Sequence, residues 1–290
     1  MKKITILLLS LLILLCGCGK EATPTEPPVQ ETEEIIEVTG PEAILDPEDM
    51  TEPLPTEFVL RTTCGAIYNE KGEEILNFEY SYDPYGRMVE FWEYEDGNVS
   101  SFSSTVYISD AEYETTYTYG ELQYSVRFTC DENGRVIHQE RTEDGAITST
   151  TSYTYDDRGN MLTMVMVYTE GTTIDMSYIY TYDDAGNPVR MEEYNAGELA
   201  GWQEETFDSE GRTTEICYYD VAGELIRRTV TTYDGNTRTD ISYDMDGTAY
   251  MTRIMVTDDH GNTLSQETWQ EDVMVSRTEY TIEEIEIIVD

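Results

Sequence analysis

From residue 58 onward, aromatic and polar residues alternate in short runs, and each run stops at a turn signal. The stretch YTYDDAGN, residues 180–187, shows the unit: two tyrosines two positions apart, then an aspartate that opens a D-x-x-G turn. Residues two apart lie on the same face of a β-strand, so the two rings of each run share one face. The pattern therefore predicts strands joined by tight turns.

The D-x-x-G turn recurs along the chain at a nearly constant spacing. Its aspartate and glycine fall at Asp83 and Gly86, Asp131 and Gly134, Asp156 and Gly159, Asp183 and Gly186, Asp208 and Gly211, and Asp258 and Gly261. A contracted copy lies at Asp234, a decayed one near Asp110, and a looser turn follows each copy about a dozen residues later. A period of about 25 residues indicates an array of one two-strand unit.

Each position of the unit has a physical reason. Aspartate at the first corner of a turn accepts a hydrogen bond from the backbone two residues on, and glycine at the fourth position takes a positive φ. Asparagine or arginine follows the glycine at Arg87, Arg135, Asn160, Asn187, Arg212 and Asn262. The rings before the turns form a stripe across successive repeats.

The tyrosine stripe has two interpretations. Its best-matching members are Tyr80, Tyr82, Tyr153, Tyr155, Tyr180 and Tyr182. The favoured interpretation is that the rings pack the sheet on itself, because they sit at a constant place in the repeat. The alternative is a binding face for sugars or a partner protein, since amphipathic rings dominate contact energetics.

The Y-x-Y-D-x-x-G-[NR] pattern, over roughly residues 78–280, resembles the YD repeats, also called RHS repeats, of bacterial Rhs and wall-associated proteins and of teneurins. The match is most specific at Asp83, Asp156 and Asp183. The resemblance implies β-sheet strips, which in the long toxins curl into a hollow shell around a cargo polypeptide. About eight repeats are too few to enclose a toxin, so we do not expect the shell and toxin functions here.

The expected fold class is all-β: an antiparallel hairpin-repeat meander of roughly sixteen strands, forming a curled or partly closed single-sheet strip. We expect the strip to have acidic ends. Glu283, Glu284 and Glu286 on the last strand would then discourage pairing at the free edge.

The amino terminus carries a targeting signal. Lys2 and Lys3 precede an apolar run, residues 4–15, and the following Leu15-Cys16-Gly17-Cys18 resembles the bacterial lipobox. Residues 1–17 are therefore expected to be a lipoprotein signal peptide, and Cys18 the lipidated residue that anchors an extracytoplasmic protein to the cell membrane. An ordinary cleaved signal peptide is the alternative.

Residues 18–57 differ sharply in composition from the repeat region, residues 58–290. Seven of the nine prolines lie there among threonines and acidic residues, and no aromatic residue precedes Phe58. Such a segment buries too little apolar surface to offset its ordering entropy. We interpret it as a disordered acidic spacer.

Charge and cysteine content exclude several classes. With 60 acidic and 17 basic residues the net charge is −43, which opposes binding to nucleic acid. Cys64, Cys130 and Cys217 are far apart without CxxC spacing, so neither a disulfide framework nor a zinc site is supported, although one optional pair remains open.

Candidate catalytic chemistry is sparse. His138 and His260 are the only histidines, too few for most nucleophilic centres. Acidic pairs in the turns, such as Asp156-Asp157, and the run from Asp244 to Gly247 suggest calcium, but they lack the further ligands of an EF-hand. We expect no cofactor and no metal.

Two functions from different classes follow. The leading one is a non-enzymatic cell-surface lipoprotein whose repeats act as a binding, adhesion or structural module for glycan or protein. The alternative is an envelope glycan hydrolase that uses paired carboxylates in a curled sheet. An enzyme needs one concave site that breaks the repeat symmetry and gathers groups with perturbed pKa values.

Overall fold

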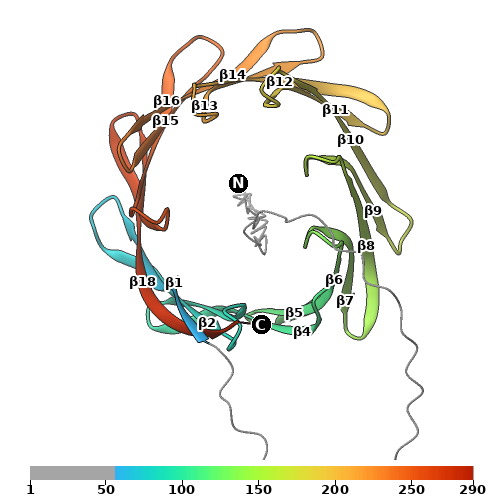
Figure 1. The fold of residues 1–290 in the computed structure, drawn as a ribbon, viewed down its shortest axis with the longest axis vertical. Helices are drawn as coiled ribbons and strands as arrows, with labels where there is room; N and C mark the ends of the chain where they lie inside the picture. The colour runs from blue at the N-terminus through green and yellow to red at the C-terminus, as the bar shows by residue number, and fades with distance from the viewer. Residues whose placement is uncertain (1–55, 290) are drawn as a thin grey trace, which may run out of the picture.

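The computed structural model describes residues 56–289, which form eighteen β-strands and no α-helix. The strands are β1 (Thr56–Asn69), β2 (Glu74–Tyr82), β3 (Met88–Glu95), β4 (Asn98–Ser109), β5 (Glu112–Tyr119), β6 (Leu122–Cys130), β7 (Val136–Glu143), β8 (Ala146–Tyr155), β9 (Met161–Tyr168), β10 (Thr173–Tyr182), β11 (Pro188–Asn195), β12 (Glu198–Phe207), β13 (Thr213–Asp220), β14 (Leu225–Asp234), β15 (Thr237–Tyr243), β16 (Ala249–Thr257), β17 (Thr263–Gln270) and β18 (Val273–Ile288). Over this range, no helix is long and apolar enough to cross a membrane. The all-β, antiparallel class is confirmed (Figure 1).

The sheet closes on itself. Each strand pairs antiparallel with the next along the chain, and β1 also pairs with β18. The expected curled, at most partly closed strip is therefore wrong: the strands form a closed 18-stranded barrel (Figure 1). The expected count of sixteen strands falls short in part because β1 precedes the first D-x-x-G copy and carries none of its tyrosine pattern.

The closing seam is the longest pairing in the sheet. β1 has 14 residues and β18 has 16, and they pair from Thr56 opposite Ile288 to Asn69 opposite Ser276. Glu283 lies opposite Arg61 within this seam. The acidic run thus does not protect a free edge, as expected from the sequence, because closure satisfies the backbone groups that an edge would expose.

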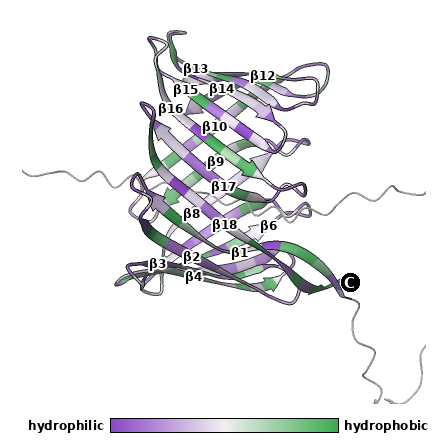
Figure 2. Cartoon of the chain, turned by 90° about the vertical axis from the view of Figure 1, so that its left-hand side faces the viewer, coloured by the Kyte–Doolittle hydropathy of each residue, from purple (hydrophilic) through white to green (hydrophobic). Residues whose placement is uncertain are grey.

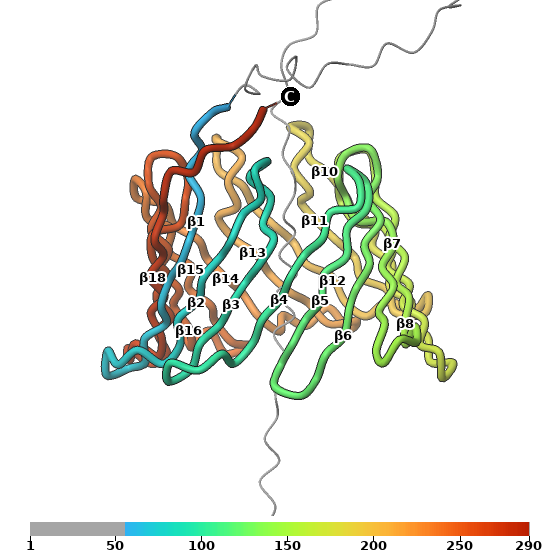
Figure 3. Tube along the Cα trace, turned by 90° about the horizontal axis from the view of Figure 1, so that it is seen from below, coloured from blue at the N-terminus to red at the C-terminus, as the bar shows by residue number. Residues whose placement is uncertain are grey.

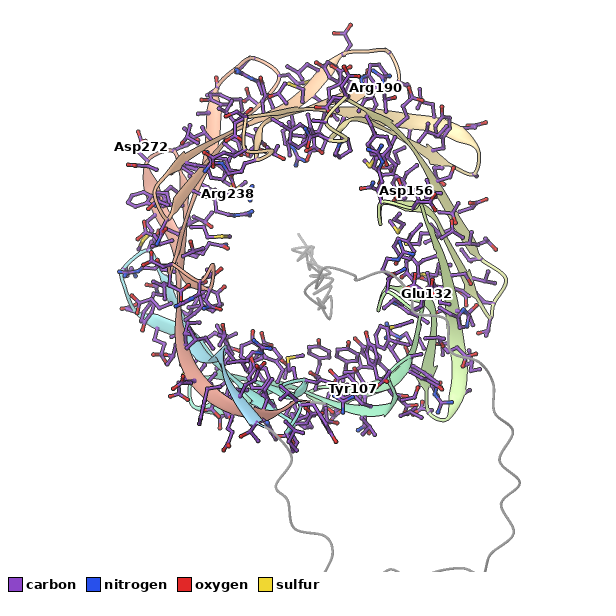
Figure 4. All side chains as sticks on the ribbon, viewed as in Figure 1. Tyr107, Glu132, Asp156, Arg190, Arg238 and Asp272 are labelled. Carbon is purple, nitrogen blue, oxygen red and sulfur yellow. The ribbon has the colours of Figure 1, made fainter. Side chains whose placement is uncertain are left out.

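The turns alternate between the two open ends of the barrel. The six D-x-x-G copies that define the repeat follow even-numbered strands and lie at one end, which we call the D-x-x-G rim. The turns after odd-numbered strands form the opposite rim and include two further turns of the same spacing, beginning at Asp220 and Asp244. β1 begins and β18 ends at the D-x-x-G rim (Figure 3). Figure 4 places Glu132 and Asp156 of this rim toward the centre and Asp272 of the opposite rim on the outside.

One face of the sheet looks into the barrel. Tyr107 and Arg238 point to the centre in Figure 4. Residues opposite each other in a ladder share a face. The register therefore extends the inner face from Tyr107 to Tyr113 and Phe128, and from Arg238 to Met255.

The described side chains do not fill the interior of the barrel. Phe78 (5% exposed) and Ile287 (8%) are the only buried hydrophobic residues in the described part of the chain, and no large side chain there is fully buried. Eighteen strands about 4.8 Å apart and tilted by about 40° make a ring roughly 36 Å across. A side-chain layer about 5 Å deep on each wall leaves roughly 25 Å open, and Figure 4 shows a centre free of described side chains.

The outer face mixes charge with isolated apolar residues. Arg190 forms an ion pair with Glu204 at 2.8 Å, and Arg127 with Glu114 at 3.1 Å. Figure 2 shows hydrophilic and hydrophobic residues interspersed along the strands. Neither face forms a hydrophobic layer, so the fold depends on backbone ladders and cross-strand pairs rather than on a core.

Candidate functional site

The first tyrosine of each predicted pair lies on the inner face. Tyr80 is opposite Phe91, Tyr153 opposite Met164, and Tyr180 opposite Met191. All three tyrosines are half-buried, because neighbours on the same wall cover their sides while no opposite wall covers their faces. The rings therefore pack along their own sheet, as Tyr80 does against Phe91 at 5.0 Å, and keep part of their surface exposed, so the packing and binding interpretations both remain predictions.

Further inner-face rings extend the stripe where the sequence pattern is weak. Tyr113 stacks on Phe128 with 4.6 Å between ring centroids, and Tyr117 stacks on Tyr124 at 5.0 Å. These pairs join β5 to β6, and β5 begins directly after the decayed copy near Asp110. The aromatic wall is thus continuous across a repeat that the motif itself does not mark.

The inner wall lowers the acidity of its phenols. Partial burial, together with the neighbouring Tyr178 and Tyr182 and the charges of Asp156 and Glu205, raises the pKa of Tyr180 to about 12. Burial and neighbouring tyrosines also raise the pKa of Tyr117 to about 12. These hydroxyls stay protonated at any physiological pH and remain hydrogen-bond donors.

The second tyrosine of each pair has a different role. At the D-x-x-G rim, the start of an odd strand separates from the end of the next even strand, and a tyrosine hydroxyl spans the gap to a backbone carbonyl. These bonds run from Tyr82 to Thr62 at 2.5 Å, Tyr107 to Met88 at 3.1 Å, Tyr155 to Val136 at 2.7 Å and Tyr233 to Thr213 at 3.0 Å. We call this contact the tyrosine clamp.

The turn aspartates are held by their own loops. Asp131 Oδ1 accepts the backbone N–H of Asn133 and of Arg135, each at 2.9 Å, and Oδ2 accepts Arg135 Nε at 2.7 Å. The six D-x-x-G glycines all have positive φ, between 74° and 92°. Hydrogen bonds to the charged form hold the pKa of the turn carboxyls at Asp131, Asp156, Asp183, Asp208 and Asp258 below the usual range.

The residue after each turn glycine connects neighbouring repeats. Arg87 lies 4.1 Å from the ring centroid of Tyr107, Arg135 4.9 Å from that of Tyr155, and Arg212 4.4 Å from that of Tyr233. Each arginine also forms an ion pair with the aspartate of its own turn. An arginine here therefore accompanies a clamping tyrosine about 20 residues later.

Where asparagine follows the glycine, the contact changes. Asn160 donates to the Tyr182 hydroxyl at 2.7 Å, and that hydroxyl donates to Asp156 instead of a carbonyl. After Asn187, the corresponding position is Phe207, which has no hydroxyl. Pairing of β11 with β12 ends at Arg190 opposite Glu204, and the strands separate beyond that pair. Because Phe207 has no hydroxyl, this gap has no clamp.

A cleft of about 630 Å³ lies at the unclamped gap. Its lining residues are Asp183, Ala185, Asn187, Val189, Glu205, Thr206, Phe207, Asp208, Ser209 and Gly211. A second cleft, of about 440 Å³, lies where β18 passes the first D-x-x-G turn and is lined by Thr63, Tyr80, Tyr82, Asp83, Pro84, Ile285 and Glu286. The first cleft coincides with a departure from the repeat.

The other candidate groups are dispersed. His138 Nδ1 lies 3.2 Å from Ser152 Oγ, whereas His260 is on the turn after β16. In residues 56–289 no group of three or more His, Cys, Asp or Glu could hold a metal ion. No disulfide joins Cys64, Cys130 and Cys217 to one another, so the optional pair is not formed in the described residues.

The amino-terminal predictions lie outside the described residues. These are the signal peptide 1–17, the lipid on Cys18 and the spacer up to residue 55. β1 begins at Thr56, two residues before the expected start of the repeat region.

Sequence reasoning missed the clamp and the cleft. The signal was present, because arginine or asparagine follows the glycine of all six D-x-x-G copies, and the residue before the turn aspartate is tyrosine in three copies but phenylalanine at Phe207, cysteine at Cys130 and threonine at Thr257. The contact between these two positions depends on which strands separate at the D-x-x-G rim, and the sequence does not show that.

Comparisons with known proteins give structural likenesses only. No family model and no curated protein matches the chain. A chain of the Photorhabdus luminescens Tc holotoxin pore is 12% identical over 75% of this chain and 15% of that chain, with a TM-score of 0.33. A porin-like protein from Bacteroides uniformis is 11% identical over 77% and 96%, with a TM-score of 0.41.

The TcdB2-TccC3 complex without its hypervariable C-terminal region gives 13% identity over 71% of this chain and 15% of that chain, with a TM-score of 0.25. The neighbours thus include Tc toxin components, which carry RHS repeats, and this chain spans about 15% of their length. All three TM-scores are below 0.5, so the likenesses carry no argument about function.

Proposed function

We propose that this protein is a non-enzymatic, cell-surface lipoprotein of short, divergent RHS/YD repeats, whose aromatic inner face binds glycan or a partner protein. A lipid on Cys18 would anchor it to the membrane on the extracytoplasmic side, and residues 18–55 would separate the barrel from the membrane. The single observation that supports binding is the set of half-exposed rings on the inner face, among them Tyr80, Tyr153 and Tyr180.

Closure favours glycan over an extended polypeptide. A peptide commonly binds a sheet by adding a strand to a free edge. All eighteen strands have two neighbours, so the described sheet offers no such edge. Ring faces and hydroxyl groups remain as the contact chemistry, and the buried Thr151 and Thr231 are among the small hydroxyl residues of the same wall.

The carboxylates favour binding over hydrolysis. An acid catalyst in glycoside hydrolysis needs a raised pKa. Every shifted carboxyl pKa among the described residues is lowered by hydrogen bonds, within the turns at Asp156 and Asp208 and from Tyr194 and Arg190 at Glu192. These acids therefore act as structural acceptors in their own loops and strands.

The test is a glycan and cell-wall array probed with the chain from residue 18 carrying Cys18→Ser, together with Tyr153→Ala and Tyr180→Ala. Tyr243→Ala on the outer face is the matched control. We expect binding that both inner-face variants reduce about tenfold and the control leaves unchanged. Equal binding by all variants would contradict recognition through the inner face.

Anchoring is tested separately. In cells, the wild-type chain should fractionate with membranes and incorporate labelled palmitate, and Cys18→Ser should do neither. Palmitate labelling that survives Cys18→Ser would contradict the lipid anchor.

A further inference from the structure

The cleft between β11 and β12 interrupts the repeat at the D-x-x-G rim. It lies between the turn that begins at Asp183 and the turn that begins at Asp208, with a volume of about 630 Å³. Ligand sites in proteins typically occupy about 300–1,000 Å³. The cleft therefore has room for a small ligand or for a short piece of a polymer.

Phe207 explains why the gap is unbridged. At the corresponding place on β14, the Tyr233 hydroxyl donates to the Thr213 carbonyl, and Arg212 covers the ring. Phe207 cannot donate, and the preceding turn ends in Asn187, which bonds its own Asp183 and has no charge to place on the ring. The exchange of arginine and tyrosine for asparagine and phenylalanine thus removes both bridging contacts.

The lining combines one ring with hydrogen-bonding groups. Asp183 and Asp208 are occupied by the backbone and side chains of their turns. Glu205 accepts one hydrogen bond from Gln203 at 2.8 Å and one from Thr213 at 3.3 Å. A carboxylate has about four lone-pair positions, so Glu205 keeps acceptor capacity for a ligand.

The cleft continues into the aromatic wall. Glu205 and Phe207 are two apart on β12, so they follow the inner-face position of Gln203, which is opposite Met191, itself opposite Tyr180. The charge of Glu205 contributes to the raised pKa of Tyr180, which places the two groups within electrostatic reach. A ligand lying along the inner wall near Tyr180 can therefore extend into the cleft.

We propose that the β11–β12 cleft is a subsite for one or two sugar units of a neutral glycan; this rests on the proposed glycan binding by the inner face. Phe207 offers a flat apolar surface to one face of a sugar ring, and Glu205 and Asn187 offer acceptors to hydroxyl groups at its edge. The net charge of −43 and the carboxylates around the cleft disfavour an anionic ligand.

Phe207→Tyr tests the subsite because it adds the single hydroxyl that closes the other gaps. Isothermal titration uses (GlcNAc)4 and cellotetraose as neutral probes and polygalacturonate as an anionic one, with the Cys18→Ser chain. We expect Phe207→Tyr to weaken binding of the neutral probe about tenfold. Phe102→Tyr, which adds the same hydroxyl to an outer-face ring opposite Trp92, should leave binding unchanged.

Glu205→Gln keeps the shape of the cleft and removes its charge, so it gives a second, independent reading. We expect a loss of about threefold to tenfold for the neutral probe. Unchanged binding in both Phe207→Tyr and Glu205→Gln would overturn the subsite while leaving binding by the inner face in place. An equal loss in the outer-face control Phe102→Tyr would also overturn it.

Two outcomes bear on the proposed function itself. No binding of any glycan by the unsubstituted chain would overturn both proposals. Slow hydrolysis of a neutral probe that is lost in Glu205→Gln would support the cleft as the sugar site and overturn the non-enzymatic assignment.

Discussion

Two neighbouring gaps at the D-x-x-G rim differ in only a few side chains. Between β13 and β14, Tyr233 clamps the Thr213 carbonyl at 3.0 Å under the guanidinium of Arg212. Between β11 and β12, Phe207 leaves a cleft of about 630 Å³. Each gap follows its own copy of the D-x-x-G turn, at Asp183 and at Asp208. The turn motif therefore sets where the strands separate, and the side chains around the gap decide whether it closes.

The largest expected effect is the loss of a whole clamping ring. Tyr233→Ala removes a half-buried ring, its hydroxyl bond and its stacking partner for Arg212, which together cost about 2–3 kcal/mol. Phe207→Ala should cost about 1 kcal/mol less, because no clamp or stack is lost there. Urea unfolding of both variants checks the difference, and equal losses would contradict the comparison.

The next effect isolates the hydroxyl. Tyr233→Phe copies the β11–β12 gap into the β13–β14 gap, with an expected loss of about 1 kcal/mol in the free energy of unfolding. Tyr243→Phe on the outer face is the control and should change stability by less than about 0.3 kcal/mol. Hydrogen exchange at the start of β13 should rise in Tyr233→Phe alone.

The reverse exchange builds the missing contacts. The double variant Asn187→Arg with Phe207→Tyr should gain about 1 kcal/mol, from a clamp to the Pro188 carbonyl and a stacked guanidinium. The two changes should be coupled. The new arginine can stack on the ring at position 207 in either background, but that ring is held in place only when its hydroxyl bonds the Pro188 carbonyl. A double-mutant cycle by urea unfolding measures that coupling, and a gain no larger than the sum of the single variants would argue against it.

The smallest effect concerns the gap between β9 and β10, where the Tyr182 hydroxyl donates to the Asp156 carboxylate instead of to a backbone carbonyl. Hydrogen bonds from Tyr182 and Asn160 lower the pKa of Asp156 to about 2. Because this folded-state pKa lies below the unfolded one, the stabilisation is present above about pH 4 and is lost as pH falls toward 2. Asp156→Asn should be less stable than wild type at pH 6, with the difference disappearing near pH 2 in thermal unfolding.

The general pH profile serves as the background for that measurement. Acidification from pH 7 toward the isoelectric point near 4.1 reduces the repulsion within a chain of net charge −43. Both proteins should therefore gain stability down to about pH 4. Only the difference between Asp156→Asn and wild type reports on the turn.

Much of the fold followed from local patterns. The D-x-x-G corners, the strand on each side of them and the shared face of Tyr180 and Met176 depend on residues close in sequence, where period-two alternation and turn chemistry act. The aromatic wall through Tyr113 and Tyr117 was harder to predict, because the turn near Asp110 has lost its motif while its strands keep theirs.

The functional reading of single residues was less accessible. Tyr80 and Tyr82 look equivalent in the sequence, yet one belongs to the open wall and the other bonds the Thr62 carbonyl 20 residues away. Phe207 looks like a conservative replacement for tyrosine. The loss of the tyrosine hydroxyl matters because, in other gaps, that hydroxyl bonds a backbone carbonyl at the start of the neighbouring strand, as Tyr233 bonds Thr213.

The sequence by itself determined the unit: a strand, a D-x-x-G corner, a second strand and the side of the sheet that carries the rings. Only the tertiary structure decided that the units close into a barrel, that the rings face an open centre and that one gap stays unbridged. The physical reason is the range of the interactions. A turn is stabilised within five residues, whereas Thr56 meets Ile288 only after every intervening pair has added its twist to the sheet.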